Sequence, residues 1–195
     1  MKKLNLFAAF SAACASFCAT AASAAIFQQI SPTPTTYVEG AMEDFLPFEF
    51  SATDSVTGTL AGLNGLFAGC EASDFAGFAA GSIALIERGG GAGAVCSFEL
   101  KVQNAAAAGA IGAIIYNREG FDGPSGGTLT SLSDITAISI SRVLGLELLA
   151  MIPQGVVVTF TGDPAAPEVP LPAAFWMFGA GLVALRASKR RSRRL

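Results

Sequence analysis

The 195-residue sequence predicts one domain of the α/β class, because a strand, a helix and a second strand follow one another with short connections. The first strand is a continuous apolar run over residues 83–86 with glycines on both sides, which is typical of a strand buried on both faces. The second is an apolar run with β-branched residues over 111–116. Because a helix connects the two runs, the handedness of such units predicts that the strands lie parallel.

The helix between these strands is predicted over residues 97–108. Ser97 is a suitable N-cap and Gly109 a suitable C-terminal residue, and Lys101 and Gln103 are expected to face water. The apolar residues that recur at helical spacing are Phe98, Val102, Ala105 and Ala106.

Further elements complete the predicted domain. Strand-like residues occupy 53–60, 136–140 and 156–160, and a helical apolar pattern covers 142–151. Two proline-rich segments, 31–35 and 163–167, are expected to be a stiff polar arm and a semi-rigid spacer outside the core.

The N-terminus predicts a secretory signal peptide over residues 1–24. Lys2 and Lys3 precede an apolar stretch, and Ala22 and Ala24 form a small-x-small cleavage site, so signal peptidase would leave Ala25 as the first mature residue. Acylation of Cys14 or Cys18, as in a lipoprotein, is the alternative, but the residues before them lack the expected Leu-led small-residue box.

Export would leave two cysteines, Cys70 and Cys96, in a compartment where disulfides persist. Two cysteines allow one intramolecular pairing, which would stabilise the fold by roughly 3 kcal/mol in the chain-entropy model. Two free buried thiols are the alternative. A metal site is not expected, because the sequence contains no histidine and only these two mature cysteines.

The charge of the predicted mature domain excludes two partner classes. Residues 25–168 contain four basic residues against all 15 acidic residues of the chain, a net charge of −11. Nucleic acid and anionic lipid surfaces are therefore not expected as partners. The charge is best interpreted as a means of solubility.

The C-terminus predicts a sorted membrane anchor. An apolar stretch over 174–185 is followed by a basic tail, which the positive-inside rule keeps in the cytoplasm. Ahead of it stands the motif Val169, Pro170, Leu171, Pro172 and Ala173. These 27 residues resemble the VPLPA-CTERM sorting signal, a variant of the PEP-CTERM class of Gram-negative bacteria. The resemblance implies an exosortase-like enzyme that removes helix and tail; a plain anchor that is never processed is the alternative.

One set of positions in the central region follows a known family pattern: Cys70, Asp74-Phe75, Ile83 to Ile86, Arg88-Gly89, Cys96-Ser97-Phe98, Asn104, Ala108-Gly109-Ala110, Asn117 and Ile138 to Ser141. On these positions the region from about Phe45 to Thr161 resembles the protease-associated (PA) domain. The resemblance implies a small sheet or open barrel flanked by short helices, acting as a non-catalytic module. The chain departs from the family pattern at 90–95, which lengthens the turn before Cys96.

Three patterns in the sequence resemble catalytic motifs, and none of them is expected to be catalytic. Ser125 stands in a G-x-S-x-G sequence, but a nucleophile elbow needs a strand before it, a helix after it and a histidine base. The glycines at 89–91 and 93 lack the register of a phosphate loop, so a turn is expected there. Carboxylates are plentiful, yet no spacing places two in one cleft.

Arg88 and Arg118 are scarce bases in an acidic domain, and each follows a predicted strand. They are candidates for binding an acidic group, with local salt bridges as the alternative.

The expected protein is thus an exported, surface-sorted PA domain without enzymatic activity or cofactor, which binds an envelope protein or polysaccharide. The predicted order is signal peptide 1–24, arm 25–44, domain 45–161, linker 162–168 and sorting signal 169–195. An accessory lid acting in trans on a secreted peptidase, a hydrolase with carboxylates only, and a structural matrix protein are the alternatives. Before processing, the C-terminal helix would anchor the chain in the inner membrane.

Overall fold

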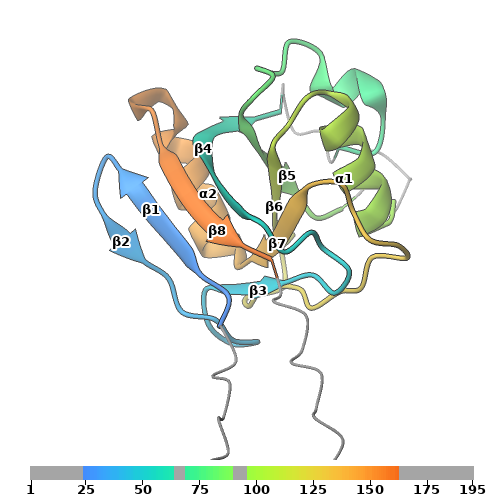
Figure 1. Ribbon diagram of the computed structural model, residues 1–195. Helices are drawn as coiled ribbons and strands as arrows, with labels where there is room; N and C mark the ends of the chain where they lie inside the picture. The colour runs from blue at the N-terminus through green and yellow to red at the C-terminus, as the bar shows by residue number, and fades with distance from the viewer. Residues whose placement is uncertain (1–23, 64–68, 90–95, 163–195) are drawn as a thin grey trace, which may run out of the picture.

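A computed structural model describes residues 24–63, 69–89 and 96–162 (Figure 1). Eight strands form one mixed sheet, in the order β2-β1-β8-β4-β5-β6-β7-β3, which curves into a half-barrel. The strands are β1 (Phe27–Ser31), β2 (Thr35–Thr36), β3 (Phe45–Pro47), β4 (Ser55–Gly62), β5 (Ile83–Glu87), β6 (Gly112–Tyr116), β7 (Thr136–Ile140) and β8 (Val157–Thr161). The helices are η1 (Ala72–Phe75), α1 (Phe98–Ala107), α2 (Arg142–Met151) and η2 (Ile152–Gln154).

The centre of the sheet is parallel. Strand β5 pairs with β4 on one side and β6 on the other, and β6 pairs with β7, all in parallel register. The antiparallel strands flank this centre, with β8 against β4 and β3 against β7. The predicted parallel pairing of the two apolar runs around α1 is confirmed.

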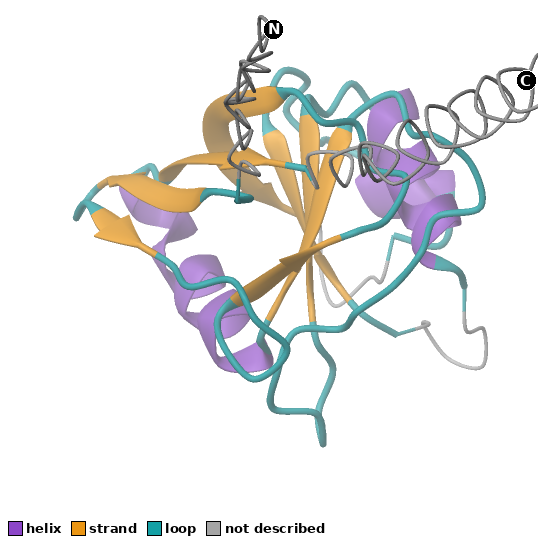
Figure 2. Cartoon of the chain, turned by 60° about the horizontal axis from the view of Figure 1, so that its bottom comes forward, coloured by secondary structure: helices purple, strands orange, loops and turns teal. Residues whose placement is uncertain are grey.

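The two long helices cover opposite faces of the central strands, and Figure 2 shows the sheet between them. Side chains of a strand alternate between faces, so Leu85 and Ile114 pack with α2 while Ile86 and Ile115 pack with α1. All four are at most 2 % exposed. This double coverage explains why the central strands are continuous apolar runs.

Serine caps begin both helices. The Ser97 hydroxyl accepts a hydrogen bond from the Leu100 amide, and the Ser141 hydroxyl accepts one from the Leu144 amide, each at 3.2 Å. After α1, Gly109 adopts a φ of 86°, a conformation that side chains disfavour. The predicted bounds of this helix agree with the structure.

The sheet begins before the domain start expected at Phe45. Strand β1 pairs antiparallel with β8, and Phe27 within it is fully buried against the rings of Phe45 and Phe160. Residues 25–44 are therefore not a separate arm, because long-range pairing with β8 recruits them. The polar turn 32–35 stays exposed, as do Thr36 and most of residues 38–43.

Several predicted features lie outside the described residues: the signal peptide with Ala22, the glycine-rich turn 90–95, and the linker and sorting signal from residue 163 onward. Within the described ranges, no helix is both long and apolar enough to cross a bilayer.

Candidate functional site

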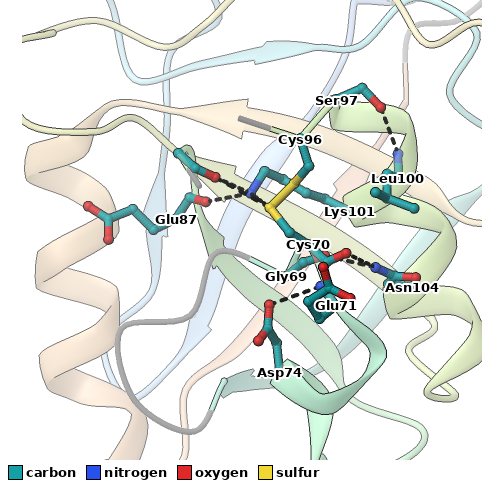
Figure 3. The surroundings of a disulfide bond; sticks show 11 residues. Gly69, Cys70, Glu71, Asp74, Glu87, Cys96, Ser97, Leu100, Lys101 and Asn104 are labelled. Atoms are coloured by element: carbon teal, nitrogen blue, oxygen red, sulfur yellow. Dashed lines mark hydrogen bonds between the residues drawn. A yellow bond between two sulfur atoms is a disulfide. The ribbon is translucent and has the colours of Figure 1, made fainter. Parts of the chain in front are cut away.

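A disulfide joins Cys70 to Cys96, with 5.7 Å between their Cα atoms (Figure 3). It ties the segment before η1 to the residue that precedes the Ser97 cap of α1. The predicted pairing is confirmed, and the alternative of two free thiols is excluded.

The helical pattern predicts that Lys101 faces water. In the structure, Lys101 is instead buried beside this disulfide. Its side chain is 1 % exposed, and its ammonium donates hydrogen bonds to the carbonyl oxygens of Gly89 at 2.7 Å and Glu87 at 3.2 Å. The prediction was wrong because α1 packs against the end of β5, where main-chain carbonyls replace water as acceptors. Figure 3 shows the ammonium between these carbonyls and the Cys70 sulfur.

Burial lowers the pKa of Lys101 to about 8, although the carboxylates of Asp74 and Glu87 act in the opposite direction. The ammonium form therefore still predominates at pH 7. A cation thus lies 3.8 Å from the Sγ atom of Cys70.

Neighbouring polar groups hold the Cys70 segment in place. The Asn104 side-chain amide donates to the carbonyl oxygens of Gly69 and Cys70, at 3.1 and 3.0 Å. A carboxylate oxygen of Asp74 accepts from the Glu71 amide at 3.1 Å. In the sequence, Asn104 and Asp74 stand out only as positions of the family pattern, because their roles depend on contacts that no local spacing shows.

Arg88 and Arg118 lie together around one aromatic ring. Their guanidinium carbons are 5.1 and 4.9 Å from the ring centroid of Phe121, which is 42 % exposed. Arg88 also lies 5.7 Å from the ring centroid of Phe98. Neither arginine forms an ion pair with a described residue, so the local salt bridges considered as the alternative are replaced by cation–π contacts.

Asn117 positions Arg88 within this group. Its side-chain oxygen accepts hydrogen bonds from the Arg88 guanidinium and from the Arg118 amide, both at 3.0 Å. Its amide nitrogen donates to the Gly123 carbonyl at 2.8 Å, which ties down the following loop. Asn117 is 3 % exposed, so this scaffold lies beneath the cationic surface.

Burial lowers the pKa of Arg88, and the positive charge of Arg118 lowers it further. The two cations are thus close neighbours, and no described carboxylate forms an ion pair with either of them. Arg142 provides the contrast, because its guanidinium forms an ion pair of 2.6 Å with Glu87. We call the group of Arg88, Arg118 and Phe121 the arginine surface.

Ser125 lies in the loop between β6 and β7, without the strand and helix that would flank a nucleophile elbow. It is 7 % exposed, and its amide donates to the Ser139 hydroxyl at 2.7 Å. In the described part of the chain, no group of three or more His, Cys, Asp or Glu side chains is placed to hold a metal ion.

Comparison with known proteins finds a family match and several relatives. Residues 56–148 match the family described as the PA domain. An aminopeptidase of Pseudomonas aeruginosa is 59 % identical over 58 residues, which are 30 % of this chain and 10 % of the enzyme. RING finger protein 148 of Mus musculus is 43 % identical over 82 residues, 40 % of this chain and 23 % of that protein.

Solved structures agree with this match. An aminopeptidase from Aneurinibacillus sp. strain AM-1 superposes with a TM-score of 0.55 at 27 % identity, over 74 % of this chain and 32 % of the enzyme. A zinc aminopeptidase from Bacillus subtilis shares the fold, with a TM-score of 0.52 at 24 % identity over 72 % of this chain and 31 % of that enzyme. This chain thus spans about a third or less of the proteins it resembles. Residues 56–148 thus match the PA domain family, and the chain has homology to aminopeptidases over this region.

Proposed function

We propose that this protein is an exported, non-catalytic PA-domain protein that binds a protein or another ligand at the bacterial envelope. The observation that carries the proposal is the PA match over residues 56–148, which covers most of the described domain. The region shared with the aminopeptidases is this domain and a minor part of each enzyme. The absence of histidine from all 195 residues supports a binding role, because the commonest general base is lacking.

The arginine surface is the binding site that we propose for an acidic group of the ligand. Guanidinium groups recognise carboxylates through paired N–H donors, and Asn117 already holds one of the two guanidiniums in place. The surrounding domain is acidic, so an anionic ligand would gain binding energy mainly at this surface. Phe121 adds exposed apolar area beside the two cations.

Affinity capture from the organism's own envelope extract tests this function. The tagged, exported chain is the bait, and captured proteins and sugars are identified by mass spectrometry. We expect a dominant partner that is lost when Arg88→Gln and Arg118→Gln are combined. Arg142→Gln is the control, because it makes the same Arg-to-Gln change, with loss of one positive charge, at a residue already paired with Glu87. Capture of no specific partner by the wild-type chain would refute a binding function.

Sorting to the cell surface is the second part of the proposal. The motif from Val169 to Ala173, the apolar stretch and the basic tail support removal by an exosortase-like enzyme. Changing Pro170 and Pro172 to Ala should block the loss of the C-terminal residues, which the mass of the envelope-derived protein reports. A wild-type mass that always includes residues 174–195 would reduce this idea to simple anchoring.

Homology to aminopeptidases favours one further candidate, an accessory domain that acts in trans on a secreted peptidase. Adding the purified protein to the organism's secreted peptidases should then change the activity of one of them. Unchanged activity in every peptidase fraction would reject this candidate and leave envelope binding as the function.

A further inference from the structure

The disulfide is electrostatically asymmetric. The Lys101 ammonium lies 3.8 Å from the sulfur of Cys70, and within the described residues the sulfur of Cys96 has no such contact. Lys101 is held in this position by two carbonyl oxygens and is almost fully buried. Both cysteine residues are half-buried and not fully enclosed.

We propose that Cys70 and Cys96 form a redox-active pair, in which Lys101 stabilises Cys70 as the thiolate and makes it the site of thiol modification. A cation next to a sulfur lowers the pKa of the corresponding thiol. A disulfide whose reduced form is stabilised in this way is easier to reduce. The co-reactant is a dithiol of the thiol–disulfide oxidoreductase class.

The thiol–disulfide exchange proceeds in two steps. A thiolate of the dithiol attacks Sγ of Cys96, the bond between Cys96 and Cys70 breaks, and Cys70 leaves as a thiolate beside Lys101. The second thiol of the reductant then attacks the mixed disulfide and releases Cys96, which takes up a proton. The reductant becomes a disulfide, the protein gains two electrons, and one of the two thiol protons of the reductant is released to solvent.

The direction of attack follows from the leaving groups. The more acidic thiol leaves faster in thiol–disulfide exchange, which favours departure of Cys70. In the reverse direction the Cys70 thiolate attacks an external disulfide and carries the mixed disulfide.

Nearby carboxylates would oppose the stabilisation of a Cys70 thiolate by Lys101, but each of them interacts with another group of the site. Asp74 on η1 and Glu87 on β5 are the carboxylates that act on Lys101. The Asp74 oxygen accepts from the Glu71 amide, and a Glu87 oxygen is paired with Arg142. The Gly89 carbonyl oxygen lies 3.8 Å from the Cys70 sulfur but only 2.7 Å from the Lys101 ammonium. Its stronger hydrogen bond is therefore the one that it accepts from Lys101.

Competitive alkylation tests the proposal on the full chain. The protein is reduced with dithiothreitol, treated with limiting iodoacetamide between pH 5.5 and 9, and digested, so that mass spectrometry reports the alkylation of each cysteine. Because the thiolate is the reactive form, we expect Cys70 to react about tenfold faster than Cys96 near pH 6. The rate profile of Cys70 should lie at lower pH than that of Cys96.

Lys101→Met removes the ammonium and keeps an unbranched side chain that is one heavy atom shorter. We expect it to abolish the advantage of Cys70 and to shift the equilibrium with a glutathione redox buffer toward the disulfide. Gln103→Met, on the exposed face of the same helix, is the matched control and should leave both readouts unchanged.

Equal alkylation rates of the two cysteines in the wild-type protein would overturn the proposal. So would a Cys70 rate that is unchanged in Lys101→Met. The wild-type comparison needs no variant, so it decides the question even where Lys101→Met does not fold. Loss of the fold on reduction, seen by circular dichroism with equal rates, also counts against the proposal, because the stabilisation requires an intact site.

Discussion

Gly145 allows helix α2 to approach the sheet. A Cβ atom at this position would overlap the side chain of Tyr116 on β6, whose ring is 5 % exposed and has little room to move. We expect Gly145→Ala to lower the free energy of unfolding by about 3 kcal/mol, since overpacking of a dense core forces side chains and backbone apart. Chemical denaturation measures the change.

Gly126→Ala is the matched control for this substitution. The Cβ atom added there would meet only the Leu46 side chain, at 3.9 Å, which is ordinary van der Waals contact. We expect a change within about 0.5 kcal/mol. If both alanine variants were equally stable, the close approach of α2 to β6 would be contradicted.

Lys101 makes stability depend on pH in a defined direction. Its pKa is about 8 in the folded state against 10.5 in the unfolded state, so between these values the unfolded state binds more protons. The free energy of unfolding therefore rises as the pH increases above about 8. The contribution of Lys101 to this rise is on the order of 2 kcal/mol between about pH 8 and pH 10. Urea unfolding at several pH values should show the rise in the wild-type protein and not in Lys101→Met.

The window for this measurement ends near pH 10. Burial raises the pKa of Tyr37 and Tyr116 to about 12, so above pH 10 the unfolded state loses protons first and stability falls. The wild-type protein and Lys101→Met both contain these tyrosines, so the difference between their free energies of unfolding reports the effect of Lys101 alone. If the difference in free energy of unfolding between the two proteins stayed constant from pH 7.5 to 10, the lowered pKa of Lys101 would be contradicted.

At the scale of elements, the serine caps decide where α1 and α2 begin. Each hydroxyl satisfies one of the amides that a helix start leaves without a partner. We expect Ser97→Ala and Ser141→Ala each to lower the free energy of unfolding by about 1 kcal/mol, measured by thermal and chemical unfolding. Ser97→Asp keeps an acceptor and should retain most of the stability; equal losses in Ser97→Ala and Ser97→Asp would argue against capping.

The elements also differ in how far local sequence predicts them. Helix α2 has the predicted bounds, 142–151, and β7 has the predicted 136–140, because strong apolar patterns and caps or turns mark both. Strand β1 was missed because its five residues, Phe27–Ser31, carry two glutamines and precede a proline-rich turn. It becomes a strand through pairing with β8, 130 or so residues further along the chain.

At the scale of the whole molecule, the disulfide restrains a loop with a sequence separation of 26 residues. Replacing both cysteines by alanine should lower the free energy of unfolding by about 3 kcal/mol, because the unfolded chain regains the entropy of the open loop. Changing both avoids a reactive single thiol. Guanidinium denaturation compares the variant with the wild-type protein in the oxidised and the reduced state; an oxidised wild-type protein no more stable than the variant would contradict a stabilising bridge.

The sequence by itself determined the central strand, helix and strand, the serine caps, the cysteine pair and the candidate arginines, because each has a local pattern or a scarce residue type. The tertiary structure decided what those residues do. It buried Lys101 beside Cys70, 31 residues away in the sequence, and placed Arg88 and Arg118 around Phe121. Arg88 is 33 residues from Phe121, whereas Arg118 lies with it in the loop after β6. Such contacts depend on how α1 packs against β5 and on how the loop after β6 returns to the sheet, and no spacing within one segment specifies either.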